Sequence, residues 1–404
     1  MSPYELSPHD LLTELKAYEP ELIAIRRDIH RHPEVGFEET RTAALVAERL
    51  RAWGLDVTEG IARTGVVATL KGNLPGQRAI GLRADLDALH IQEMPGRDHG
   101  STVPGKMHAC GHDGHTAMLL GAARYLAEHP DTFGGTVTFI FQPAEEGLGG
   151  GREMVAQGLF DRFPVDAVYG MHNMPGLPAG EFRTRTGAFL AASDTWTVVF
   201  NGTGGHGGAG AHHATDVTLP LAHFITALQT IVSRNIAAAD TAVISIGSIQ
   251  GGDAGSPNII PSQVTITGTA RSYQPKVRDL MEKRLTELAE TQAAAFGCSA
   301  EVIYDRRYPP LITHAEPTAV SIAAATALVG ADKVETDCPP VTSSEDFSFM
   351  LQTRPGGFIM IGNGATPDGA VHHVHTPGYD FNDEILGLGA AYWIQLVRTE
   401  LAAD

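Results

Sequence analysis

The chain has 404 residues, of which 43% are hydrophobic and 19% are charged. Its 29 basic and 47 acidic residues give a formal net charge of −18, which argues against nucleic acid or an anionic membrane as a partner and favours a small-molecule substrate. A chain of this length exceeds the size at which single cores stop growing, so we expect two domains.

The N-terminus and the cysteines predict the compartment. The first ten residues lack the basic stretch and apolar run of a secretory signal. No segment approaches the roughly 20 uninterrupted apolar residues that a membrane span needs. Cys110, Cys298 and Cys338 are few, odd in number and widely spaced, so a disulfide framework is not expected and a reducing compartment fits. We predict a cytoplasmic protein.

The first half of the chain has the pattern of an α/β domain. Helical spacing of leucine and isoleucine predicts a helix over residues 8–31, and a second helix over 41–53 ends at Gly54. Short apolar runs predict four buried strands, at 65–70, 78–82, 136–141 and 165–169. A helix at about 114–129 lies among them. Strands that alternate with helices imply a mixed, mostly parallel sheet flanked by helices.

After Gly187 the pattern changes. Strands are predicted at 195–200, 242–249, 264–270 and 300–304, with helices at about 216–234 and 277–296. This β-α-β-β-α-β order is typical of a ferredoxin-like α+β sandwich, with two helices on one face of an antiparallel sheet. The α/β pattern returns with a strand at 356–361 and a helix at 383–398. We therefore predict a catalytic domain of residues 1–189 and 308–404, with a lid and dimerisation domain inserted at 190–307.

Polar residues that could bind a metal follow the predicted strands of the first domain. In an open parallel sheet, ligands bind outside the carboxyl ends of the strands. The residues that follow four separate strands are Asp85 and Asp87, Glu145 and Glu146, His172, and His372, His373 and His375. Acidic and imidazole groups that converge from several strand ends indicate a metal site.

The run HACGHDGH carries His108, Cys110, His112, Asp113 and His115 just before a predicted helix. Thiolate, imidazole and carboxylate donors together suit zinc, cobalt or manganese rather than calcium or magnesium. Taken alone, the run could be a helix N-terminus with Asp113 near the cap and His115 in solvent. The other candidates at strand ends favour a metal site.

The adjacent carboxylates Glu145 and Glu146 allow a division of roles. Neighbouring residues in an extended chain point to opposite sides. One carboxylate can therefore bind a metal while the other acts as the general base that takes and returns the proton of an activated water.

A glycine-rich segment, NGTGGHGGAG, contains His206 and spells G-x-G-x-x-G from Gly202 to Gly207. This spacing matches a dinucleotide-binding loop, which requires a parallel strand ending in an acidic residue about 20 residues later. The sequence has no such strand, because Asp240 precedes its strand. We expect instead a flexible loop that presents His206 to a ligand held by the other domain.

Nine motifs occur in the order found in the aminoacylase-type metallopeptidases: RRDIHRHPEVGFEET, GLRADLDAL, HACGHDGH, FQPAEEG, GMHN, GGHGG, SPNIIP, SSEDFSFM and HTPGYDFND. Within this family the chain resembles the branch of hippurate hydrolases and auxin-conjugate (IAA-amino acid) amidohydrolases, in which a cysteine replaces the bridging aspartate. The resemblance covers nearly the whole chain. It implies a di-metal catalytic domain with an inserted lid domain that often mediates dimer formation.

Residue roles follow from this resemblance, motif by motif. The implied metal ligands are Cys110, His112, Glu146, His172 and His375. Glu145 is implied to be the general base, and Asp85 the aspartate that orients a ligand. His206 is implied to stabilise the tetrahedral oxyanion or to hold the substrate carboxylate. Asn258 and Arg271 fall in lid segments that often contribute to substrate binding.

The resemblance implies hydrolysis of an amide between an acyl or aroyl group and an amino acid, with two divalent ions that could be zinc, manganese or cobalt. It also implies a homodimer or homotetramer formed through the lid domain. A dipeptidase or carboxypeptidase would use the same machinery, and a catalytically silent metal-binding protein is the non-enzyme alternative. The chain departs from the family after His206, where a proline usually follows the histidine; here GGHGGAGAHHATD reads through Gly210 without a proline and carries an extra residue.

Overall fold

The computed structural model describes residues 7–365 and 369–403, and the chain divides into two compact units. The first unit comprises Met1–Gly187, Ile312–Pro339 and Asp346–Asp404, and the second comprises Ala188–Leu311 and Pro340–Glu345. Strands β7 (Gly187–Leu190) and β14 (Leu311–Thr313) span two positions at which the chain passes from one unit to the other. None of the helices in the described ranges combines the length and apolar composition needed to cross a membrane.

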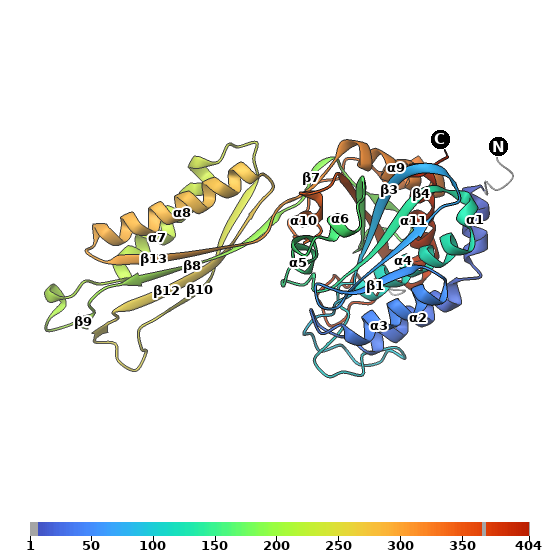
Figure 1. Ribbon diagram of the computed structural model, residues 1–404. Coiled ribbons are helices and arrows are strands. Elements are labelled where there is room, and N and C mark those ends of the chain that lie inside the picture. Colours follow the sequence, from blue (N-terminus) through green and yellow to red (C-terminus); the bar gives the residue numbers. More distant parts are fainter. Residues whose placement is uncertain (1–6, 366–368, 404) are drawn as a thin grey trace. The chain divides into compact units, whose positions relative to one another are not determined.

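A mixed sheet of eight strands forms the centre of the first unit, in the order β1-β2-β4-β3-β5-β16-β6-β15 (Figure 1). The strands are β1 Asp56–Ile61, β2 Gly65–Lys71, β3 Leu74–Asp85, β4 Gly134–Gln142, β5 Ala167–Pro175, β6 Phe182–Arg183, β15 Val334–Glu335 and β16 Gly356–Gly364. The central strands β4, β3, β5 and β16 are parallel, whereas β1, β2 and β6 pair in antiparallel fashion with neighbours. The predicted mixed, mostly parallel sheet is confirmed.

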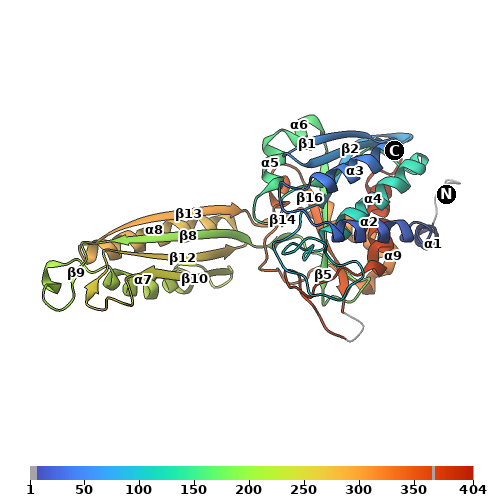
Figure 2. The same ribbon diagram turned by 90° about the horizontal axis from the view of Figure 1, so that it is seen from below.

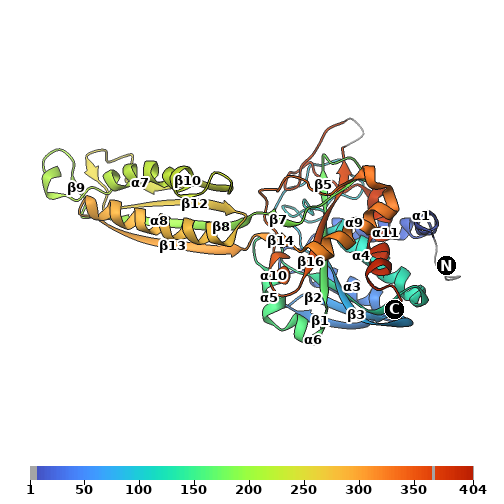
Figure 3. The same ribbon diagram turned by 90° about the horizontal axis from the view of Figure 1, so that it is seen from above.

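Helices cover both faces of this sheet. They are α1 Pro8–Leu15, α2 Glu19–Arg31, α3 Thr40–Ala52, α4 His112–Glu128, α5 Gly150–Ala156, α6 Leu159–Arg162, α9 Ala315–Val329, α10 Ser348–Leu351 and α11 Leu386–Glu400. Figures 2 and 3 show α4 and α9 on one side of the sheet and α5 and α6 on the other. Each face is therefore shielded from water, as a parallel sheet requires.

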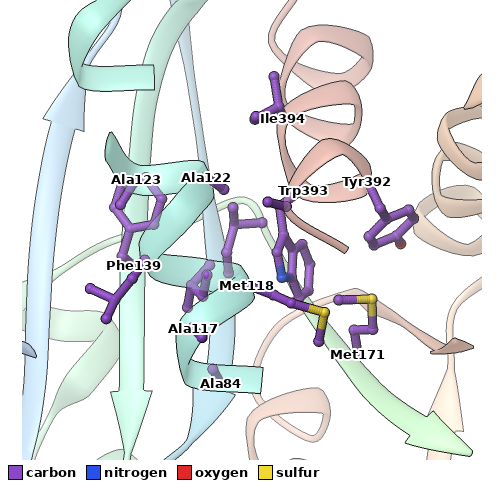
Figure 4. Close-up of a cluster of buried hydrophobic side chains, with 14 of the residues drawn as sticks. Ala84, Ala117, Met118, Ala122, Ala123, Phe139, Met171, Tyr392, Trp393 and Ile394 are labelled. Atoms are coloured by element: carbon purple, nitrogen blue, oxygen red, sulfur yellow. The ribbon is translucent and has the colours of Figure 1, made fainter. Parts of the chain in front are cut away.

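In the core of the first unit, α11 packs on α4. Met118 of α4, Met171 of β5 and Trp393 of α11 meet there, each no more than 1% exposed (Figure 4). Gly389 permits this close approach, because a Cβ atom there would lie 1.9 Å from the Met118 sulfur. This packing holds the N-terminus of α4, where HACGHDGH lies, against the carboxyl ends of the parallel strands.

The single helix predicted over residues 8–31 is wrong, because the chain forms α1 and α2 with a break between them. Pro20 stands in the first turn of α2. A proline has no N–H and its ring clashes with the preceding turn of a continuous helix, but it suits a first turn. Leu15 and Leu22 are buried on either side of the break, so both helices still present an apolar face.

A four-stranded antiparallel sheet forms the second unit, in the order β10-β12-β8-β13. Its strands and helices are β8 Ala192–Asn201, α7 Thr218–Thr230, β10 Ala242–Gly251, β12 Gln263–Ser272, α8 Pro275–Ala295 and β13 Ser299–Tyr308. Both helices cover one face of the sheet, where Trp196, Val198 and Phe200 of β8 are buried. The elements follow one another as β-α-β-β-α-β, apart from the short strands β9 (Gly205–His206) and β11 (Ile259–Ile260), which pair with each other.

A buried ion pair ties α8 to this sheet. Arg278 Nε donates to both carboxylate oxygens of Asp194 at 3.0 Å, and the Tyr304 hydroxyl donates to Asp194 at 3.0 Å. We expect Asp194→Ala to destabilise the second unit by about 3–5 kcal/mol, because Arg278 would stay buried without its counter-charge. Urea denaturation measures this, with the exposed Asp305→Ala as control, for which about 0.5 kcal/mol or less is expected. A loss below about 1 kcal/mol for Asp194→Ala would contradict the prediction.

Candidate metal centre

Potential metal ligands gather at the carboxyl edge of the eight-stranded sheet. Three overlapping groups have donor atoms within 4.8 Å of one another: Cys110 with His112 and His172, Cys110 with Glu146 and His375, and His112 with Glu145 and Glu146. All five predicted metal ligands and the predicted general base therefore lie in one cluster of the first unit.

The backbone around Cys110 and His112 is locked by Gly111, which has a φ of 96°. A Cβ at this position would lie 2.2 Å from Asn173 Nδ2 and 2.4 Å from the Tyr379 hydroxyl, so only glycine fits. Asn173 Nδ2 donates to the Cys110 carbonyl at 2.6 Å, and the Tyr379 hydroxyl donates to Asn173 Oδ1 at 2.8 Å. These contacts fix the directions in which the thiol and the imidazole leave the chain.

His172 and His375 reach the cluster from two other segments. His172 lies inside β5 and not after its end, since β5 pairs with β16 as far as Pro175. The predicted strand end at residue 169 was too early, because β16 comes from a distant part of the sequence and extends the pairing. His172 Nε2 lies 3.3 Å from Cys110 Sγ. His375 follows β16, and its N–H donates to the Ala109 carbonyl at 2.7 Å.

Two aspartates at the end of β3 contact histidines of the cluster. Asp85 Oδ1 lies 2.7 Å from His115 Nδ1, and Asp85 Oδ2 lies 3.8 Å from His112 Nε2. Asp87 Oδ1 lies 3.1 Å from His112 Nδ1. The carboxylate that contacts Nδ1 of the predicted ligand His112 is thus Asp87, which the sequence placed among the metal-site candidates without an individual role. The signal was its place two residues after Asp85, which puts both carboxylates on one side of an extended chain.

The donors fit divalent cations. His112 Nε2 is buried and has no hydrogen-bond partner among the described residues. Burial, and then the neighbouring carboxylate of Glu146, raise the pKa of the Cys110 thiol well above its usual range. Burial opposes the charge on His112, but Asp85 and Asp87 raise its pKa to about 10. A cation would offset these shifts, because thiolate and neutral imidazole are the forms that bind metals.

A buried polar network adjoins Glu145. Arg83 Nη1 donates to Asp85 Oδ2 at 2.6 Å, and Arg83 Nη2 donates to Asp346 Oδ1 at 3.2 Å. Gln142 Nε2 donates to the same Asp346 oxygen at 2.7 Å, and the Asp346 N–H donates to Glu145 Oε1 at 3.3 Å. Sequence reasoning assigned no role to Arg83 or Asp346. The available signal for Arg83 was its position directly after the predicted strand at 78–82, beside Asp85.

The predicted substrate-binding residues lie in the second unit. His206 Nδ1 accepts the backbone N–H groups of Gly208 and Ala209, each at 3.1 Å. The pairing of β9 with β11 brings His206 next to the segment that carries Asn258. Arg271 lies near the opposite end of β12 from that segment, and burial lowers its pKa. The structure therefore brings His206 and Asn258 together but not Arg271.

The contact between Asp87 and His112 leads to a prediction for metal affinity. Asp87→Asn is expected to weaken metal binding by about 10- to 100-fold, because the carboxylate that orients the His112 ring is lost. Asp87 Oδ2 also accepts the N–H of Glu146, another predicted ligand, at 2.9 Å, and the single amide oxygen of asparagine cannot replace both carboxylate oxygens. Titration against a competing chelator measures the affinity, with Asp56→Asn on the exposed strand β1 as the control. Equal affinities for the two variants would contradict the expected role.

The chain is similar in sequence and in structure to known hydrolases and peptidases. The sequence profile of "Peptidase family M20/M25/M40" matches residues 81–399. Hippurate hydrolase of Campylobacter jejuni is 38% identical over 388 residues, covering 96% of this chain and 98% of that one. IAA-amino acid hydrolase ILR1-like 4 of Arabidopsis thaliana is 37% identical over 375 residues, covering 92% and 83%. A solved structure, a dinuclear metal binding peptidase from the M20 family of Bacillus subtilis, has a TM-score of 0.83 at 31% identity, covering 96% and 100%.

Proposed function

The chain belongs to peptidase family M20/M25/M40, and we propose that it hydrolyses N-acyl or N-aroyl amino acids to a carboxylic acid and a free amino acid. The resemblance drawn from the nine motifs is confirmed. The prediction of an amide hydrolase that uses two divalent ions is also confirmed. The substrate class is supported by the relatives named hippurate hydrolase and IAA-amino acid hydrolase, since both names describe an acyl group on an amino acid.

The observation that carries this proposal is the position of Glu145 inside the ligand cluster with His112 and Glu146. Divalent ions held by Cys110, His112, Glu146, His172 and His375 would supply Lewis-acid chemistry, polarising a carbonyl oxygen and making water a stronger acid. Glu145 takes the proton of the attacking water and returns it to the leaving amine. Its Oε1 accepts the Asp346 N–H, which restrains the carboxylate in one orientation.

His206, Asn258 and Arg271 are proposed to bind the substrate. Because His206 Nδ1 accepts two backbone N–H groups, the proton of the neutral ring resides on Nε2. This arrangement supports donation from Nε2 to a substrate oxygen. A homodimer or homotetramer formed through the second unit, and a cytoplasmic location, are further proposals that rest on the sequence.

A substrate panel tests the proposed function. The protein is stripped of metal, reconstituted with zinc, manganese or cobalt, and assayed with N-acetyl, N-benzoyl and indole-acyl amino acids beside dipeptides. We expect hydrolysis of the acylated amino acids. A strict requirement for a free α-amine would favour the dipeptidase alternative. Stoichiometric metal without hydrolysis of any compound would favour a catalytically silent protein.

A further inference from the structure

The loop that carries Glu145 and Glu146 between β4 and α5 is held by buried carboxylates. Three of them each accept one backbone N–H from this loop or from the start of α5: Glu39 from Ala144 at 2.8 Å, Asp87 from Glu146 at 2.9 Å and Asp346 from Gly151 at 2.8 Å. Asp87 and Asp346 also contact residues of the metal centre. Glu39 comes from the start of α3, and its other oxygen accepts the Thr64 hydroxyl at 2.6 Å.

Ala144, the residue that Glu39 holds, has an uncommon backbone conformation. Its φ is 54°, in the left-handed region that costs conformational energy for any residue with a Cβ atom. Its N–H donates to Glu39 Oε1, and its carbonyl accepts the Gly150 N–H at 3.0 Å. Because Ala144 directly precedes Glu145, its dihedral angles set the direction in which the Glu145 side chain leaves the loop.

The burial of Glu39 is not explained by packing. The residue is 0% exposed, and its hydrogen-bond partners in the described part of the chain are a hydroxyl and a backbone N–H, with no basic side chain among them. Burial, which the two hydrogen bonds only partly offset, raises the pKa of Glu39 to about 7. An apolar side chain of similar size would fill the same space without this cost. What the carboxylate adds at this position is the pair of hydrogen bonds that it accepts.

We propose that Glu39 is a positioning residue for Glu145. By accepting the Ala144 N–H, Glu39 keeps Ala144 in its left-handed conformation and so keeps the Glu145 carboxylate directed at the ligand cluster. The inference rests on the proposed function of Glu145 as the general base. It predicts that loss of the acceptor slows the chemical step while substrate affinity and metal content stay unchanged.

Two substitutions at Glu39 separate hydrogen bonding from charge and packing. Glu39→Met keeps the length but removes the acceptor, and kcat is expected to fall about 10- to 100-fold with KM changed less than about threefold. Glu39→Gln is expected to keep kcat within about threefold, because its amide oxygen accepts the Ala144 N–H and its amino group donates to Thr64. The matched control is Glu38→Gln, a neighbour whose side chain is 64% exposed, which should leave kcat unchanged.

A second measurement does not depend on activity. In the metal-loaded protein, hydrogen exchange of the peptide spanning residues 143–151 should be at least about tenfold faster in Glu39→Met than in the wild type. It should be unchanged in Glu39→Gln and Glu38→Gln. If Glu39→Met does not fold, Glu39→Asp provides the same test, because it keeps the charge but is one methylene too short to reach both partners.

The outcomes distinguish the two proposals. Unchanged kcat and unchanged exchange in Glu39→Met overturn the role of Glu39. Equal losses in Glu39→Met and Glu39→Gln overturn it too, since the charge and not the hydrogen bond would then matter. Absence of hydrolysis by the wild type across the substrate panel rejects the proposed function instead. In that case the exchange rates alone decide whether Glu39 holds the loop.

Discussion

Replacement of Glu145 by glutamine is expected to abolish turnover and to leave both metal ions in place. A glutamine cannot take a proton from water, and the contribution of a positioned general base is typically about 10²- to 10⁴-fold in rate. The glutamine oxygen can still accept the Asp346 N–H, so the local structure should persist. The five predicted ligands are untouched by this change. We therefore expect kcat to fall with little change in KM.

The measurement combines steady-state kinetics on the best N-acyl amino acid with elemental analysis of the purified protein. Glu48→Gln, on the exposed side of α3, controls for the loss of one carboxylate elsewhere in the unit. Near-normal kcat in Glu145→Gln with full metal content would show that the base is another group. Loss of metal together with activity would instead make Glu145 a ligand.

Replacement of Cys110 by alanine is expected to have the other large effect. Cys110 is the residue shared by the group with His112 and His172 and the group with Glu146 and His375. A thiolate at this position would donate to both groups, so its loss is expected to weaken both. We expect substoichiometric metal and a fall in kcat/KM of at least about 10³-fold, equivalent to roughly 4 kcal/mol of transition-state stabilisation.

The same thiol gives this prediction a pH dependence. Because burial and nearby carboxylates raise the pKa of Cys110, the metal-free site holds a protonated thiol. Metal uptake should therefore release a proton, and the affinity for metal should rise with pH. Calorimetric titration in buffers of different ionisation enthalpy measures the proton release. Cys298→Ala, in the second unit, is the matched control and should leave both metal content and activity unchanged. Full metal content in Cys110→Ala would refute the shared-ligand role.

Much of the fold could be predicted because its local patterns are strong. Runs of apolar residues predicted the strands β2, β4, β5 and β16. The elements of the second unit follow one another in the predicted order, β-α-β-β-α-β. Errors arose at the ends of elements. The strand predicted to end at residue 82 continues to Asp85, since pairing with β4 carries the polar residues Arg83 and Asp85 into the buried sheet. Periodicity reports which face is buried but not how far a partner strand extends the pairing.

The sequence by itself determined the chemistry of the site: a thiol and an imidazole flanking Gly111, and two adjacent carboxylates directly after a buried strand. These features are local, so neighbouring residues suffice to recognise them. Only the tertiary structure decided which acid contacts which group. Asp87 contacts His112, and Glu39 holds the residue before Glu145 across more than 100 positions of sequence. Such contacts depend on the register of the whole sheet and on the helices packed against it, which no single segment encodes.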